Sequence, residues 1–207
     1  MNQLAKIGKY QVMEERQSDD GTVFARSVAE PDVFTIIFDR HYRSVYGYLS
    51  RRVGRVIADD LAAETFIRAF ERRSSYDPTA ERALPWLLGI AVNLLAHHHR
   101  SEGRQFRALA AAGSRAASSG GETAEELDAA SSEQLVAALA QLDEYDREAL
   151  LLYVWGELKY TEIAGVLGIP VGTVRSRLNR ARRKLRRALN PDDENVVQLR
   201  HAGGKND

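Results

Sequence analysis

The stretch YTEIAGVLGIPVGTVRSRLNRARRKLRR, residues 160–187, decides how the rest of the chain is interpreted. Three apolar residues in its first part fall on one face at helical spacing: Ile163, Ala164 and Leu167. Thr161 is expected to cap this helix, because its hydroxyl can accept a hydrogen bond from a backbone N–H of the first turn. Gly168 suits a left-handed helix end, where glycine carries no steric cost. The stretch therefore opens with a short helix that ends in a tight turn.

A second, longer helix is predicted around Pro170, which suits a first helical turn because its missing N–H is not needed there. Four apolar residues, spaced by four, three and four, define its buried face: Val174, Leu178, Ala181 and Leu185. The other faces carry eight cations and no anion between Val171 and Arg187. A merely solvated helix would usually mix acids with bases, whereas an all-cationic surface suits the neutralisation of phosphate charge. The pattern is that of a helix-turn-helix, which places its second helix in the DNA major groove.

The composition favours an all-α protein. The chain has 207 residues, of which 44% are hydrophobic, enough to bury the cores of one or two small domains. No run alternates with the period of two that marks a half-buried strand. The absence of cysteine excludes a disulfide framework and a cysteine-based zinc site. No segment has the length and apolarity of a membrane span or of a secretory leader, so we expect no membrane insertion and a cytoplasmic location.

The formal net charge is zero, but the charges are segregated along the chain. Residues 108–148 contain nine acids and two arginines, a net charge of −7. Residues 149–190 contain nine cations and two acids, a net charge of +7. An acidic block beside a basic domain indicates several distinct partner surfaces.

The order of patterns along the chain predicts two small helical domains joined by a flexible linker, with the helix-turn-helix in the second. The residues from Ser18 to Gly21 suggest a loop within a polar segment, and Ser118 to Gly121 give the clearest linker signal. The predicted parts are a mobile N-terminal extension at 1–30, a first domain at 31–107, a linker at 108–130, a second domain at 131–189 and a polar tail at 190–207.

Two groups in the first domain are open to a bland or a functional interpretation. Asp60 and Glu64 share one side of a predicted helix, which on structural grounds alone is more often a solvated face than a site. Trp86 precedes a cluster of histidine and arginine, a combination that fits nucleic acid, although a lone tryptophan is more often core. The adjacent histidines 97–99 point about 100° apart on a helix, so they cannot converge on one metal ion. We find no nucleophile–base pair and no phosphate loop, and we expect no catalytic residue, metal or cofactor.

Three segments in this order resemble the bacterial RNA polymerase sigma factors, specifically the two-domain extracytoplasmic-function group. Residues 59–70, DDLAAETFIRAF, are similar to the helix that binds core polymerase. Residues 85–93, PWLLGIAVN, resemble the helix that opens and reads the minus-ten element. Residues 160–164, YTEIA, with residues 172–177, GTVRSR, resemble the reader of the minus-thirty-five element.

The resemblance covers residues 32–107 and 131–189 and implies a promoter-directing subunit rather than an enzyme. It implies binding to the beta and beta-prime subunits of core RNA polymerase, binding to promoter DNA, and an anti-sigma factor as a further partner. It assigns core-polymerase binding to Asp60, Leu61, Glu64 and Phe66. It assigns minus-ten DNA binding to Tyr76, Trp86, Asn93, His97 and Arg100.

The recognition helix should enter the groove with its N-terminal residues. The candidates for minus-thirty-five DNA binding are Val171, Thr173, Arg175, Ser176, Arg177 and Arg180. Among them Arg175 is the best candidate for a base edge, because a guanidinium can pair two ways with guanine. Arg177 and Arg180 are expected at phosphates, while Val174 and Leu178 should point into the core.

The main alternative is a helix-turn-helix regulator that binds an operator without polymerase, with residues 32–107 as a sensor or dimerisation domain. That alternative predicts a palindromic site, because a dimer reads two half-sites. A more distant alternative is an enzyme that uses the acidic helix and the histidine cluster. Promoter-dependent run-off transcription with core polymerase separates the first two possibilities.

Overall fold

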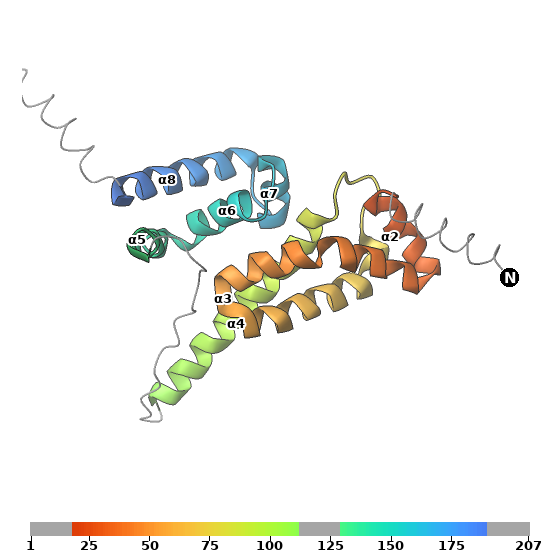
Figure 1. Ribbon diagram of the computed structural model, residues 1–207, viewed down its shortest axis with the longest axis horizontal. Helices are drawn as coiled ribbons and strands as arrows, with labels where there is room; N and C mark the ends of the chain where they lie inside the picture. Colours follow the sequence, from red (N-terminus) through yellow and green to blue (C-terminus); the bar gives the residue numbers. More distant parts are fainter. Residues whose placement is uncertain (1–17, 112–128, 190–207) are drawn as a thin grey trace, which may run out of the picture. The chain divides into compact units, whose positions relative to one another are not determined.

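The computed structural model describes residues 18–111 and 129–189. Within these two ranges the chain forms helices and no strand, which confirms the all-α prediction. The chain divides into two compact units, Met1–Thr123 and Ala124–Asp207 (Figure 1). The predicted polar tail and the first 17 residues of the predicted N-terminal extension lie outside the described residues.

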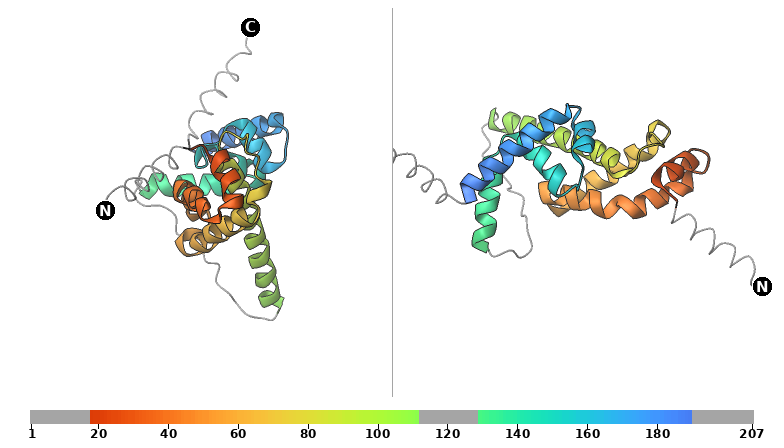
Figure 2. Two further views of the ribbon diagram at one scale, coloured as in Figure 1. Left: turned by 90° about the vertical axis from the view of Figure 1, so that its right-hand side faces the viewer. Right: turned by 90° about the horizontal axis from the view of Figure 1, so that it is seen from above.

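Two long helices, α3 (Thr35–Glu71) and α4 (Leu84–Ala111), lie side by side and form the body of the first unit (Figures 1 and 2). Helix α3 breaks at Gly54, whose φ of 76° and ψ of 170° are not helical. The break depends on glycine because a Cβ disfavours a positive φ. The core between the helices is built from residues that include Ile37, Tyr48, Leu49, Ala62, Leu87, Leu88 and Leu95.

A helix, α2 (Asp20–Ala29), occupies the last third of the segment that we predicted as a mobile extension, and it includes the second half of the predicted loop. Asp19 caps it, with a carboxylate oxygen 2.9 Å from the backbone N–H of Thr22. Val23 and Phe24 are 2% and 1% exposed, so the helix belongs to the core. The prediction failed because one turn and a half of apolar spacing is too short to show a helical period. Two 3-10 turns, η1 (Pro31–Phe34) and η2 (Arg73–Ser75), follow α2 and α3.

Gly21 brings α2 against the loop that precedes α4. A Cβ atom at this position would overlap the carbonyl oxygen of Pro78. The close approach therefore requires glycine for its lack of a side chain, and it fastens the start of α2 to a loop far along the chain.

The second unit contains α5 (Ala129–Ala140), α6 (Glu144–Val154), α7 (Tyr160–Leu167) and α8 (Val171–Leu189). Gly168 ends α7 with a φ of 62° and a ψ of 36°, the left-handed conformation that was predicted. Thr161, in contrast, is not the cap of α7. The helix starts after Lys159, whose backbone N–H donates to the Glu162 carboxylate over 2.6 Å. A carboxylate three residues into a helix accepts from the N–H of the N-cap residue, which is a different donor from the one that a capping hydroxyl would satisfy.

Helix α8 packs on the other three helices of this unit and supplies the centre of its core (Figure 1). Val174, Leu178 and Ala181 are fully buried, as the spacing predicted. Leu185 is only partly buried, because the helix extends past its neighbours. The predicted linker, residues 108–130, overlaps two helices. Helix α4 continues to Ala111, and α5 begins at Ala129, so the segment contains the last turn of α4 and the start of α5.

Candidate functional site

The first turns of α8 present the residues expected to meet DNA. Arg175 and Ser176 are exposed, and Val171 and Thr173 are partly exposed. The hydroxyl of Ser176 donates to the carbonyl of Gly172 over 3.0 Å, so it already has one partner within the helix. The helix start thus offers one charged and several small side chains without bulk between them.

Arg180 makes an ion pair that the sequence did not predict. Its Nε lies 3.0 Å from Oδ2 of Asp146, and its Nη2 lies 2.8 Å from Oδ1 of the same carboxylate. Asp146 is only 2% exposed, so this two-bond pair neutralises a buried charge and ties α6 to α8. Two donors of Arg180 are committed to this pair, while its side chain is 48% exposed, so its contact with phosphate stays a prediction.

Two further arginines of α8 rest on tyrosine rings. The guanidinium of Arg177 lies 5.0 Å from the ring centroid of Tyr145. The guanidinium of Arg182 lies 5.0 Å from the ring centroid of Tyr153, and its Nη1 donates to the Tyr160 hydroxyl over 3.3 Å. Sequence reasoning found the cations but missed these partners, because each pair joins different helices at separations that no periodicity reveals.

Other cations of α8 remain at its surface. Arg175 stands near the start of the helix, and Arg183, Lys184 and Arg186 are exposed further along it. Exposed cations of this kind can neutralise phosphates. The cations of α8 therefore divide into those held by side chains of the same unit and those that face solvent.

The second half of α3 carries the acidic pair. Asp60 is exposed, and Glu64 is half-buried beside Arg68, whose Nε donates to its carboxylate over 2.7 Å. Leu61 is partly exposed between them. The structure thus brings Asp60, Leu61 and Glu64 to one surface, which is the arrangement that a protein-binding site on this helix needs.

Phe66 does not share that surface. It is 4% exposed and packs edge-to-face against Phe38, with ring centroids 4.9 Å apart. Its predicted contact with polymerase is therefore corrected to a core role. Apolar side chains that are exposed on α3 are instead Val56 at 80%, Ile67 at 54% and Phe38 at 40%. Sequence spacing could not separate these from core positions.

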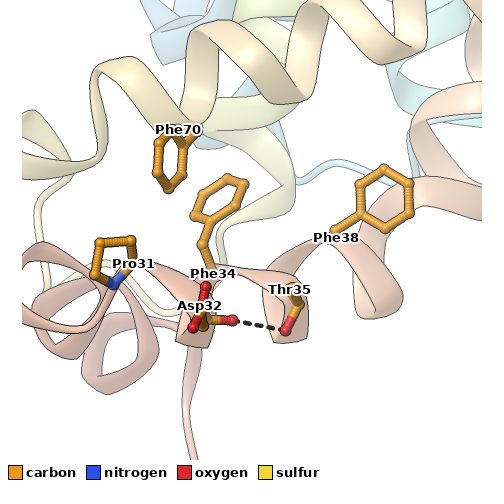
Figure 3. A pocket seen from close by; sticks show the side chains of 6 residues that line it. All are labelled: Pro31, Asp32, Phe34, Thr35, Phe38 and Phe70. Carbon is orange, nitrogen blue, oxygen red and sulfur yellow. Dashed lines mark hydrogen bonds between the residues drawn. The ribbon is translucent and has the colours of Figure 1, made fainter.

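A pocket lies where η1 and the first turns of α3 meet the C-terminal end of α3. Aromatic rings line it (Figure 3). The rings of Phe34 and Phe70 meet edge-to-face, with centroids 5.3 Å apart. The Thr35 hydroxyl donates to the carbonyl of Asp32 over 2.8 Å and holds the rim. The remaining lining residues are Pro31 and Phe38.

One face of α4 carries four of the five residues predicted for minus-ten DNA. Asn93, His97 and Arg100 are exposed, and Trp86 is partly exposed. Spacings of seven, four and three place them on one side of the helix. The side-chain amide N–H of Asn93 donates to the carbonyl of Gly89 over 2.9 Å, and this bond does not use the amide oxygen.

Tyr76, the fifth candidate, lies in the core. It is 6% exposed and stacks on Phe24 with ring centroids 4.1 Å apart. Trp86 meets both rings edge-on, at 5.3 Å from Phe24 and 5.4 Å from Tyr76. Burial raises the pKa of Tyr76 to about 12. Tyr76 therefore supports Trp86 from behind instead of meeting a base itself.

Asp20 ties this region together. Its carboxylate lies 3.0 Å from Nη1 of Arg40, 2.8 Å from Nε2 of His41 and 3.0 Å from the backbone N–H of Ala83. Burial alone would raise the pKa of Asp20, but the hydrogen bonds of His41, Ala83 and Arg40 outweigh it and hold the pKa well below its usual range. The carboxylate thus links α2 and α3 to the start of α4.

Among residues 18–111 and 129–189, no group of three or more histidine, cysteine or acidic side chains is placed to hold a metal ion. Over the same residues, no helix combines the length and the apolarity needed to cross a membrane.

Comparisons with known proteins agree with both units. Residues 37–105 match the family Sigma-70 region 2, and residues 132–185 match the family Sigma-70, region 4. The chain is 33% identical to the ECF RNA polymerase sigma factor BldN of Streptomyces coelicolor over 79% of its own length and 62% of that protein. It is 31% identical to the ECF RNA polymerase sigma factor SigL of Mycobacterium tuberculosis over 81% of its own length and 94% of that protein.

A solved structure shows the same fold. It is the sigma factor RpoE in complex with the anti-sigma factor NepR from Bartonella quintana, with a TM-score of 0.58 and 24% identity. The match covers 80% of this chain and 99% of that chain.

Proposed function

Because the chain belongs to the ECF sigma factors of RNA polymerase, we propose that it binds core polymerase, directs it to particular promoters and helps melt the minus-ten region. The observation that carries this proposal is the pairing of two surfaces in one chain. One face of α4 presents a partly exposed aromatic ring with exposed amide, imidazole and guanidinium groups, and the start of α8 presents an exposed arginine. A polymerase subunit that both reads a duplex and captures a melted strand needs both surfaces.

The surface on α4 suits single-stranded DNA. Asn93 offers a carbonyl oxygen to a base edge, while His97 and Arg100 lie one and two turns further along the same face. Trp86 is braced by Phe24 and Tyr76, so its partly exposed ring is held in place. A fixed aromatic ring can stack on an unstacked base, while a cation such as Arg100 further along the helix neutralises phosphate. Flexible A·T-rich steps lower the cost of taking a base out of the duplex.

The surface on α8 suits duplex DNA. Arg175 is exposed near the start of the helix, where a recognition helix meets base edges. Val171, Thr173 and Ser176 are small enough to let the backbone approach the groove. Arg177 lies roughly 200° around the helix axis from Arg175, and we propose that it meets a phosphate at the flank of the groove.

The surface on α3 suits core polymerase. We assign its contact to Asp60, Leu61 and Glu64, and leave out the buried Phe66. The beta-prime and beta subunits are the partners that the family implies. The mechanism is one of binding and conformational change, and the nucleotidyl chemistry belongs to the core enzyme. Transcription takes place in the cytoplasm, where we expect this chain to act.

An anti-sigma factor is a further proposed partner. The RpoE structure with a similar fold holds the anti-sigma factor NepR. A partner that covers the polymerase-binding surface of α3 would keep the chain from core polymerase.

Run-off transcription tests the proposed function directly. Core RNA polymerase with this chain should transcribe from members of a randomised promoter library, and core polymerase alone should not. The double variant Asp60→Ala, Glu64→Ala should weaken binding to core polymerase. Glu30 is an exposed acid between α2 and η1, and the control variant Glu30→Ala should bind core polymerase like wild type. Arg175→Ala should cost roughly 1–3 kcal/mol in promoter binding and relax the preference at one or two positions.

Two results would contradict the proposal. One is a chain that binds a palindromic duplex tightly without polymerase and yields no run-off product, as an operator-binding regulator would. The other is normal affinity of the Asp60 and Glu64 double variant for core polymerase in a titration.

A further inference from the structure

Tyr145 is a large aromatic residue on the surface of the second unit. It is the second residue of α6 and is 64% exposed. Its backbone N–H donates to the carboxylate of Asp143 over 3.0 Å, which fixes the start of the helix. The guanidinium of Arg177 lies 5.0 Å from its ring centroid. A cation over an aromatic face is attracted by the negative face of the ring, so this contact restrains the arginine.

We propose that Tyr145 is a positioning residue for DNA binding, whose ring holds the Arg177 guanidinium ready for a backbone phosphate beside the minus-thirty-five element. The inference rests on the proposed function. Arg177 follows Arg175 by two residues, which is roughly 200° around the helix axis. The two cations therefore stand on opposite sides of α8, one toward the base edges and one toward the flank that α6 borders.

Holding an arginine in advance matters because a free side chain loses rotamer freedom when it binds phosphate. A guanidinium that already rests on a ring loses less of that freedom. The ring leaves the N–H donors at the edge of the guanidinium plane available, since stacking uses only the face. We therefore expect Tyr145 to strengthen the contact of Arg177 with phosphate without contacting a base itself.

Arg182 supplies a matched comparison within the same helix. It lies 5.0 Å from the ring centroid of Tyr153, the same distance as in the other pair. It follows Arg177 by five residues, which is roughly 140° further around the axis, and it stands past the first turns of α8. Its Nη1 also donates to the Tyr160 hydroxyl over 3.3 Å, so this pair supports packing between helices. Removing the ring of Tyr153 should leave DNA affinity unchanged.

The test uses the full chain assembled with core RNA polymerase and a fluorescent promoter duplex that the wild-type assembly selects from a randomised library. Dissociation constants are measured for Tyr145→Leu, Tyr145→Phe and the control Tyr153→Leu over a series of salt concentrations. Tyr145→Leu should weaken binding about two- to fivefold, the effect of losing an exposed cation–π contact. Tyr145→Phe should bind like wild type because it keeps the ring, and so should Tyr153→Leu.

A double-mutant cycle separates positioning from a structural effect. In an Arg177→Ala background, Tyr145→Leu should cause no further loss of affinity and no further change of the salt slope. An equal loss in both backgrounds, or wild-type affinity of Tyr145→Leu, would overturn the inference. If Tyr145→Leu also melts at a lower temperature, Tyr145→Phe and the cycle still decide. A wild-type assembly that selects no duplex would instead refute the proposed function.

Discussion

Phe24 is the residue through which α2 is built into the first unit, and Phe24→Ala measures how much that helix contributes. The side chain is 1% exposed and meets three rings, with centroids 5.8 Å away at Phe34, 4.1 Å at Tyr76 and 5.3 Å at Trp86. Replacing a buried phenylalanine by alanine costs about 3–5 kcal/mol, from lost transfer free energy and from the cavity left behind. Each lost aromatic pair is worth about 0.5–1.5 kcal/mol beyond area, so we expect the upper part of that range.

Trp86 reports this change directly, because it touches Phe24. The chain has two tryptophans, and in a Trp155→Phe background Trp86 becomes the sole fluorescent reporter of the first unit. Urea titration followed by this fluorescence gives the free energy of unfolding for wild type and variant. For a domain of this size each kcal/mol lowers the thermal midpoint by roughly 4–8 °C.

Val28 offers a matched control on the same helix. It is 50% exposed, so Val28→Ala should change the free energy of unfolding by less than about 0.5 kcal/mol. A Phe24→Ala variant within about 1 kcal/mol of wild type would refute the packing of α2 against the aromatic cluster. The reasoning would also fail if deleting residues 1–30 left the transition of the first unit in place.

Three further predictions concern single side chains. Gly21→Ala should destabilise the first unit by about 1–3 kcal/mol through overpacking, while Gly165→Ala, where a Cβ would meet nothing within 4 Å, should be neutral or stabilising in urea titrations. Arg180→Ala should lower the thermal midpoint of the second unit, because it leaves the buried Asp146 without its counter-ion. An unchanged midpoint together with weaker DNA binding would contradict this and would favour a contact with phosphate instead. Asp20 has a depressed folded-state pKa, so its stabilisation is full above its ordinary pKa of 3.8 and is lost as pH falls through the folded value. Asp20→Asn should therefore lower stability at neutral pH and flatten the acid limb of the stability curve below about pH 4, and parallel curves for wild type and variant would contradict this.

Local patterns in the sequence were sufficient for the frame of this protein. The spacing of Val174, Leu178 and Ala181 identified the buried face of α8, since a helix places residues three and four apart on one side. Gly168 marked a helix end, because a positive φ is easy for glycine and costly for other residues. The charge segregation and the helix-turn-helix pattern indicated DNA binding from residues that lie close together in the chain.

Only the tertiary structure decided which of the remaining side chains face solvent and which serve the core. Phe66 and Tyr76 look like surface candidates by position, yet partners on other segments bury them. Arg180 resembles its cationic neighbours in the sequence, but Asp146, 34 residues earlier, holds it. Pairings of this kind depend on which helices pack together, and a one-dimensional period contains no information about contacts between distant segments. Local sequence patterns therefore determined the helices other than α2, and the packing determined α2 and the role of each charged and aromatic side chain.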